Sequence, residues 1–196
     1  MYTLGVNNNS VPNLVIVAGP NGAGKSTIAD FLTANRSISR YINADVIARG
    51  MAAGEADGSD IGAGRVLLKL VKEAVSKRES FAFESTMSGL LWKNLIQEAQ
   101  NIGYEVTICY VAVSSEDISL ERIRQRVKEG GHNIPQDTVK RRYKKSLSRF
   151  LNSYRHKVDH WCFFDNSGRD AMMIAACTKS NELIFEPEIW REYERR

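Results

Sequence analysis

The chain has 196 residues, of which 43% are hydrophobic and 26% are charged, and its formal net charge is +4. These values are ordinary for one globular domain, and this length allows a full hydrophobic core. No apolar run approaches the roughly 20 residues that a membrane helix needs. No basic residue precedes Lys25, so we expect no secretory leader. The small positive charge suits an anionic ligand such as a nucleotide, but it is too weak to indicate a nucleic-acid partner by itself.

Three cysteines, Cys109, Cys162 and Cys177, show no C-x-x-C spacing. The first two lie in apolar runs that are typical of strands. We therefore interpret all three as small buried hydrophobic side chains in a reducing cytoplasm rather than as metal ligands. The three histidines lack metal-site spacing as well, and we expect a cytoplasmic protein.

Short apolar runs alternate with helical patterns along most of the chain. The predicted strands are, in chain order, 14–18, 41–42, 81–83, 104–113 and 161–164. The predicted helices are 25 to about 35, 61–77, 90–101, 116–128, one that opens at Pro135, and a short one near 169–177. We expect residues 1–12 and 178–196 to form loose terminal tails.

This alternation predicts an α/β fold of one domain, in which a mostly parallel five-stranded sheet lies between two layers of helices. Ligands of such sheets bind at the carboxyl ends of the strands. Polar clusters follow four of the predicted strands, and we expect them to converge on one edge of the sheet. The four clusters are 21–27, 43–45, 84–86 and 165–167.

The segment Gly-Pro-Asn-Gly-Ala-Gly-Lys-Ser-Thr matches the phosphate-loop (Walker A) pattern G-x-x-x-x-G-K-[ST], directly after a strand and before a helix. Backbone N–H groups of such a loop wrap a phosphate, and the following helix directs its positive dipole end at it. Lys25 is expected to reach the β- and γ-phosphates, and the Ser26 hydroxyl to ligate Mg²⁺. An ordinary glycine-rich turn is the alternative. The predicted nucleotide-binding residues are Gly19, Pro20, Asn21, Gly22, Ala23, Gly24, Lys25, Ser26 and Thr27.

Two carboxylates follow the next two strands. We interpret Asp45 as the base that accepts the proton of an attacking hydroxyl, and a helix N-cap is the alternative. Glu84 ends the third strand, where it either holds a substrate hydroxyl, ligates Mg²⁺ through water, or caps the turn with Ser85 and Thr86. No long apolar strand ends in Asp-Glu, the pairing typical of many motor and transporter ATPases. This absence favours a kinase, which needs a second substrate held in line.

Two predicted helices in a region of about 115–158 are rich in basic residues. Arg122 and Arg126 are i, i+4 neighbours on the first helix, a spacing at which like charges repel unless they share an anion. Gly130-Gly131 separates them from the second helix, which contains Arg141 and Arg142. We interpret this region as a lid, hinged at the glycines, that closes over a triphosphate. Guanidinium groups suit the spread charge of a transferring phosphoryl group.

Two other interpretations of the basic helices stay open. A solvated basic face is the commonest source of a run of like charges. A nucleic-acid surface is less favoured, because the aromatic residues Tyr143, Phe150 and Tyr154 fall at core spacing and are poor candidates for base stacking.

The chain resembles the zeta toxin family of P-loop kinases. The phosphate loop is shared by all P-loop proteins, whereas the stretch that joins the two basic helices is much more specific. The segments that carry the resemblance are the loop 19–27, Ile-Asn-Ala-Asp (42–45), Phe-Glu-Ser-Thr-Met-Ser-Gly (83–89), Arg-Ile-Arg-Gln-Arg (122–126), Gly-Gly-His-Asn-Ile-Pro (130–135), Arg-Arg-Tyr-Lys-Lys-Ser-Leu (141–147) and Asp-Asn-Ser (165–167).

The resemblance implies an adenylate-kinase-like core with a helical lid, which phosphorylates a hydroxyl of a UDP-N-acetylamino sugar with ATP or GTP and Mg²⁺. It also implies an antitoxin protein as a partner. The implied catalytic residues are Asp45 as general base, Lys25, Arg126, and Arg141 or Arg142 at the transferring phosphate. The implied ligand-binding residues are Ser26 for the metal, Arg126 at the nucleotide, and Asp45, Glu84, Ser85, Thr86 and Arg142 for the acceptor. Residues 121–126 also resemble the lid entry of adenylate kinases, which implies that Arg122 lies beside the adenine.

Two alternative functions stay open at this point. The first is a kinase that acts on another small-molecule hydroxyl or on a polynucleotide 5′-hydroxyl. Of these two acceptors, only the polynucleotide predicts a steep salt dependence of the reaction. The second is an ATP-dependent switch with slow hydrolysis and no acceptor, for which ATP turnover would not respond to any added hydroxyl compound.

Overall fold

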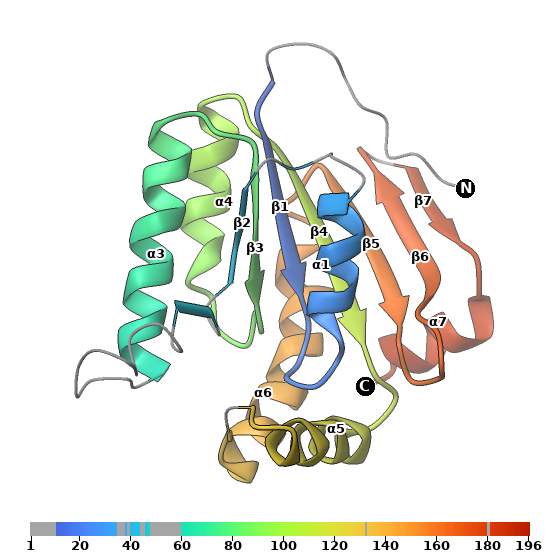
Figure 1. Ribbon diagram of the computed structural model, residues 1–196. Helices are drawn as coiled ribbons and strands as arrows, with labels where there is room; N and C mark the ends of the chain where they lie inside the picture. Colours follow the sequence, from blue (N-terminus) through green and yellow to red (C-terminus); the bar gives the residue numbers. More distant parts are fainter. Residues whose placement is uncertain are drawn as a thin grey trace.

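The computed structural model describes residues 11–34, 38, 40–43, 46–47, 60–131, 133–179 and 181–196. In these residues, one sheet lies between helices (Figure 1). The strands are β1 (Asn13–Ala18), β2 (Arg40–Ile42), β3 (Phe81–Ser85), β4 (Glu105–Ala112), β5 (His160–Asp165), β6 (Met172–Thr178) and β7 (Asn181–Ile184). The helices are α1 (Lys25–Ala34), α3 (Asp60–Ser76), α4 (Trp92–Asn101), α5 (Glu116–Lys128), α6 (Gln136–Arg149), the π-helix η1 (Phe150–Tyr154) and α7 (Pro187–Glu194).

The sheet has the strand order β2-β3-β1-β4-β5-β6-β7. Its first five strands pair in parallel, which confirms the predicted α/β fold and its parallel core. Strands β6 and β7 add to one edge in antiparallel fashion. The described sheet therefore has seven strands rather than the predicted five.

The residues after β5 differ most from the prediction. The short helix predicted near 169–177 is wrong, because residues 172–178 form strand β6. Methionine and alanine favour helices, but Ala175 is buried and pairs with Phe163 of β5, and this tertiary pairing outweighs local propensity. The segment predicted as a loose C-terminal tail contains strand β7 and helix α7.

Alternate residues of the central strand β1 belong to two hydrophobic clusters, one on each face of the sheet. Leu14 and Ile16 lie in the larger cluster, which α3, α4, α6, η1 and α7 cover. Val17 lies in the smaller cluster, which α1 covers. Burial on both faces makes such a strand a nearly continuous apolar run in the sequence. Among the described residues, no helix has the length and apolar character needed to cross a membrane.

Stacked aromatic rings fix α6 and α7 to the sheet. Phe150, the first residue of η1, stacks on Tyr110 of β4 with ring centroids 4.5 Å apart. Trp190 of α7 stacks on Trp161 of β5 at 5.6 Å. Burial raises the pKa of Tyr110 far above its ordinary value, so this side chain stays a neutral phenol. Its hydroxyl donates a hydrogen bond of 2.9 Å to Ser146 Oγ, which ties α6 to the centre of the sheet.

We expect Trp190→Ala to lower the free energy of unfolding by about 3–5 kcal/mol, because it empties a packed site that α7 fills in the core. The measurement is urea unfolding followed by circular dichroism. Leu183→Ala in β7 is the matched control, because Leu183 is 45% exposed whereas Trp190 is 2% exposed. Equal effects of the two substitutions would show that α7 contributes no core packing.

Candidate active site

The phosphate loop joins β1 to α1 at the carboxyl edge of the parallel strands, in the strand–loop–helix context that the motif requires. Gly22 has φ +74°, and a Cβ there would lie 2.6 Å from the backbone oxygen of Ser119 in α5. Gly24 has φ +86°, and a Cβ there would lie 2.3 Å from Nδ2 of Asn166, after β5. Positive φ favours glycine at both positions, and at Gly22 the close backbone of Ser119 also excludes a side chain.

The side chains of Lys25 and Ser26 lie at the first turn of α1. Lys25 Nζ donates a hydrogen bond of 2.9 Å to the carbonyl oxygen of Pro20, across the loop. Ser26 Oγ donates one of 2.8 Å to Oε1 of Glu84. The structure thus joins two of the predicted site residues, the proposed metal ligand and the acid at the end of β3.

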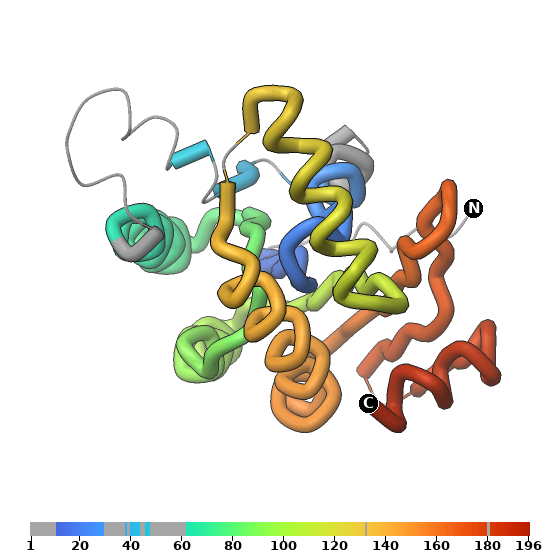
Figure 2. Tube along the Cα trace, turned by 90° about the horizontal axis from the view of Figure 1, so that it is seen from below, coloured from blue at the N-terminus to red at the C-terminus, as the bar shows by residue number. Residues whose placement is uncertain are grey.

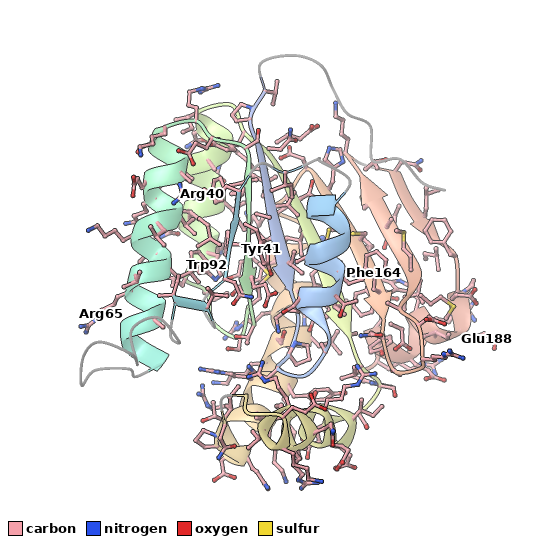
Figure 3. The ribbon with its side chains drawn as sticks, viewed as in Figure 1. Arg40, Tyr41, Arg65, Trp92, Phe164 and Glu188 are labelled. Carbon is pink, nitrogen blue, oxygen red and sulfur yellow. The ribbon has the colours of Figure 1, made fainter. Side chains whose placement is uncertain are left out.

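Glu84 is only 8% exposed, and its position follows from the register of β1 and β3, in which Val17 pairs with Glu84. The hydroxyl of Tyr41, on β2, donates a second hydrogen bond to the same Oε1 atom. Figure 3 labels Tyr41 on this short strand beside β3. Two hydroxyl groups from different elements therefore converge on one oxygen of a buried carboxylate.

The cluster after β5 also reaches the phosphate loop. Asn166 Nδ2 donates a hydrogen bond of 2.8 Å to the carbonyl oxygen of Ala23. The amide of Ser167 donates to Oδ1 of Asp165 at 2.8 Å, and Ser167 Oγ accepts from the amide of Ser114 at 2.7 Å. This cluster therefore connects the loop to the end of β4, where the first basic helix begins.

Three of the four predicted polar clusters thus gather at the expected edge of the sheet. The fourth is described only in part: the carbonyl oxygen of Asn43 accepts a hydrogen bond of 3.1 Å from the amide of Ile47. Asp45 lies outside the described residues, and its role as general base stays a prediction.

Ser85 and Thr86 shape the segment that follows Glu84. Ser85 Oγ accepts hydrogen bonds from Trp92 Nε1 at 2.7 Å and from the amide of Met87 at 3.0 Å. The Thr86 carbonyl oxygen accepts from Ser146 Oγ in α6 at 2.5 Å. Trp92 lies at the start of α4 (Figure 3). The hydroxyl of Ser85 therefore holds this segment in shape, while the predicted contact of both residues with an acceptor stays a prediction.

The two basic helices α5 and α6 form one packed unit. Leu120 and Ile123 of α5 meet Ile134 and Val139 in a small hydrophobic cluster. In Figure 2, which views the molecule from this side, α5 crosses in front of α1. Because Ser119 also packs against Gly22, α5 lies directly against the phosphate loop.

Gly130 and Gly131 have a definite role in this unit. Gly130 has φ +85°, and its amide donates to the carbonyl oxygen of Val127 at 3.0 Å. The amide of Gly131 donates to the carbonyl oxygen of Arg126 at 2.8 Å. These two bonds form the Schellman motif that ends a helix. The glycine pair is thus a helix stop in the structure, and a hinge at this point stays a prediction.

The predicted arginines lie on both lid helices. Arg122 Nη2 donates a hydrogen bond of 3.4 Å to the carbonyl oxygen of Gly168, in the segment after β5. Arg126 and Arg141 are exposed, whereas Arg142 is half-buried. The structure therefore ties Arg122 to the β5 segment, and the contacts of the other three with a phosphate stay predictions.

Arg196 also reaches the segment between β4 and α5, and no motif in the sequence predicts this contact. Arg196 Nη1 donates to the carbonyl oxygen of Ser114 at 2.8 Å, and its guanidinium lies 4.6 Å from the ring centroid of Tyr193. Tyr143 of α6 donates its hydroxyl to the carbonyl oxygen of Val113 at 3.0 Å. Burial raises the pKa of Tyr143, and the nearby Arg196 charge reduces this rise. The segment between β4 and α5 is therefore held by both α6 and Arg196.

The oxygen atoms at this edge fit Mg²⁺. Ser26 Oγ and the Glu84 carboxylate lie 2.8 Å apart, and oxygen ligands of this kind are those that Mg²⁺ prefers. In the described part of the chain, no group of three His, Cys, Asp or Glu side chains gathers to hold a metal. A magnesium ion here would take its remaining ligands from nucleotide phosphates and water.

The sheet, the phosphate loop and the lid together define a P-loop kinase fold, which several solved structures share. A chain of the AvrRxo1-ORF1:-ORF2 complex with ATP matches with a TM-score of 0.76 and 16% identity, over 95% of this chain and 64% of that chain. A chain of the PezAT toxin-antitoxin system of Streptococcus pneumoniae matches with a TM-score of 0.60 and 16% identity. The match covers 98% of this chain and 88% of that chain. A gluconokinase from Sinorhizobium meliloti matches with a TM-score of 0.50 and 15% identity. The match covers 80% of this chain and 83% of that chain. This chain spans less than two thirds of the AvrRxo1 chain.

Residues 14–150 match the AAA_33 family, described as an AAA domain, and because this range is more than half of the chain, the protein belongs to that family. The matched range contains the phosphate loop, Glu84 and both lid helices. An uncharacterized protein of Haemophilus influenzae is 35% identical over 129 residues, which are 66% of this chain and 91% of that protein. The family and the fold together support the prediction of a phosphotransferase.

We expect Gly24→Ala to weaken the binding of ATP with Mg²⁺ by more than about tenfold, because the added Cβ displaces Asn166 and strains the loop. Isothermal titration calorimetry measures the affinity. Gly64→Ala in α3 is the matched control: nothing lies within 4 Å of its Cβ position, so binding is unchanged and stability rises by about 0.5–1 kcal/mol. Unchanged affinity in Gly24→Ala would contradict the assignment of this loop.

Proposed function

We propose that the protein is a kinase of the zeta-toxin type, which transfers the γ-phosphoryl group of ATP or GTP to a hydroxyl of a UDP-N-acetylamino sugar. One observation carries the proposal: Ser26 of the phosphate loop is hydrogen-bonded to the buried carboxylate of Glu84 at the end of β3. In the proposal, Ser26 belongs to the donor side and Glu84 to the acceptor side. A kinase needs this juxtaposition to hold two substrates in line.

In the proposed reaction, Asp45 takes the proton of the acceptor hydroxyl while that oxygen attacks the γ-phosphorus. The bond from the γ-phosphorus to the β,γ-bridging oxygen breaks, and the nucleoside diphosphate leaves. Lys25 and the loop amides hold the phosphates. Arg126, with Arg141 or Arg142, offsets the charge that spreads over the transferring group. Bound Mg²⁺ would supply further charge compensation between the β- and γ-phosphates.

The surroundings of the segment after Glu84 favour an anionic acceptor. Helix α6 touches this segment through the bond from Ser146 to Thr86, and Arg142 lies one turn before Ser146 on the same helix. A half-buried guanidinium at this place suits a diphosphate, because its planar donors form paired hydrogen bonds with phosphate oxygens. A nucleotide sugar supplies such a diphosphate together with free hydroxyl groups.

The structural neighbours support two further parts of the proposal. The AvrRxo1 complex was solved with ATP, which supports ATP as the phosphate donor. PezAT is a toxin-antitoxin system, which supports an antitoxin protein as a partner of this chain. The proposed donor and acceptor are both cytoplasmic metabolites, in agreement with the predicted location.

The test is a screen for a phosphorylated product by mass spectrometry, with ATP and Mg²⁺ and with UDP-N-acetylglucosamine as the first acceptor. We expect a phosphorylated nucleotide sugar from the wild type. Asp45→Asn should bind ATP normally but transfer phosphate about 10²- to 10⁴-fold more slowly, as is usual when a general base is lost. Asp117→Asn is the matched control, because Asp117 lies on the exposed first turn of α5.

Two results of this screen would contradict the proposal. ATP turnover that no acceptor changes would indicate an ATP-dependent switch. Phosphate transfer to a polynucleotide 5′-hydroxyl alone, with a steep dependence on salt concentration, would indicate a polynucleotide kinase. Normal turnover in Asp45→Asn would overturn the base assignment without touching the choice of acceptor.

A further inference from the structure

The hydrogen bond between Tyr41 and Glu84 follows from the pairing of β2 with β3. Tyr41 pairs with Ala82, and Glu84 lies two residues further along β3. Side chains two residues apart on a strand point to the same face of the sheet, so Tyr41 reaches Glu84 diagonally across the two strands. Tyr41 and Ala82 both pack in the cluster under α1, the helix that carries Ser26. The three side chains therefore meet on one face of the sheet.

Glu84 depends on these two hydroxyl groups. Within the part of the chain that the structure describes, its hydrogen bonds come from Ser26 and Tyr41, and it takes part in no ion pair. A carboxylate that is 8% exposed needs such donors, because burial removes the water that would otherwise solvate it. Both donors approach the same oxygen, Oε1.

The two donors have different duties. In the proposed function, the Ser26 hydroxyl would ligate Mg²⁺ through an oxygen lone pair, and its O–H would still donate to Glu84. Tyr41 is the donor that the metal ion would not engage, and it is fixed by its strand and by packing in the cluster under α1. Without the Tyr41 hydroxyl, Ser26 alone would have to hold both the metal ion and the carboxylate.

We propose that Tyr41 is a positioning residue, which holds the Glu84 carboxylate beside the phosphate loop and the metal ion that Ser26 would ligate. This inference rests on the proposed function. Tyr41 acts through Glu84 and does not itself contact the reacting atoms. Its effect therefore appears in how strongly the metal ion promotes nucleotide binding, rather than in nucleotide binding alone.

The experiment compares Tyr41→Phe with the wild type in titrations of a fluorescent ATP analogue, with excess EDTA and across a range of Mg²⁺ concentrations. With EDTA, we expect affinities within twofold of each other, because the ring and its packing are retained. In Tyr41→Phe, the Mg²⁺ concentration that gives half of the maximal enhancement of nucleotide binding should rise about tenfold. This is the usual effect of losing one hydrogen bond to a charged group. Direct binding of Mn²⁺ to the nucleotide complex, followed by electron paramagnetic resonance, gives a second readout.

Tyr104→Phe is the matched control. The Tyr104 hydroxyl donates to the carbonyl oxygens of Ala74 and Glu79 at 3.2 and 2.8 Å, just before β4 at the opposite end of the sheet from the phosphate loop. We expect this variant to lose stability but to keep the wild-type Mg²⁺ dependence. A double-mutant cycle with Glu84→Gln adds a further test: if Tyr41 acts through Glu84, Tyr41→Phe has no additional effect in that background.

Three results would overturn the inference. They are an unchanged Mg²⁺ dependence in Tyr41→Phe, an equal loss of affinity with and without Mg²⁺, and additive effects of Tyr41→Phe and Glu84→Gln. These titrations follow nucleotide and metal binding, so they are independent of the acceptor. A wild-type protein that binds ATP with Mg²⁺ but phosphorylates nothing would contradict the proposed function and leave the assignment of Tyr41 intact.

Discussion

The close packing of the phosphate loop is the constraint on which the rest of the site depends. Gly22 packs against the backbone of Ser119 in α5 with no room for a side chain, and Gly24 faces the end of the Asn166 side chain after β5. Interiors packed this tightly transmit a displacement instead of absorbing it. A shift of α5 must therefore move the loop or break the contact at Gly22. This contact couples α5 directly to the backbone of the phosphate loop, whether or not the glycine pair at 130–131 bends.

Local chemical signals explain why much of this arrangement could be predicted from the sequence. Helix α5 begins and ends where predicted, because Ser115 caps it by accepting a bond from the Ile118 amide and Gly130 supplies the positive φ that ends it. The phosphate loop is likewise specified by its own residues. The convergence of the clusters after β1, β3 and β5 follows from a rule about parallel sheets, which needs only the order of the elements.

The features that could not be predicted depend on contacts between distant segments. Strand β6 has a composition that favours a helix, and only its pairing with β5 makes it a strand. Arg196 reaches Ser114 from a segment with no recognisable motif. Tyr41 resembles any aromatic residue on a short strand until the register shows that Glu84 lies diagonally opposite.

The distribution of charge divides the site between the sheet and the lid. The acidic group, Glu84, is fixed at a strand end by hydroxyl donors from α1 and β2, whereas Arg122, Arg126 and Arg142 are carried by α5 and α6. Cations brought together with Lys25 repel one another unless an anion lies between them. A lid of this kind closes more favourably over a loop that holds phosphates than over an empty one. Nucleotide binding would then itself provide the attraction that completes the site, while Glu84 keeps a fixed position at the end of β3.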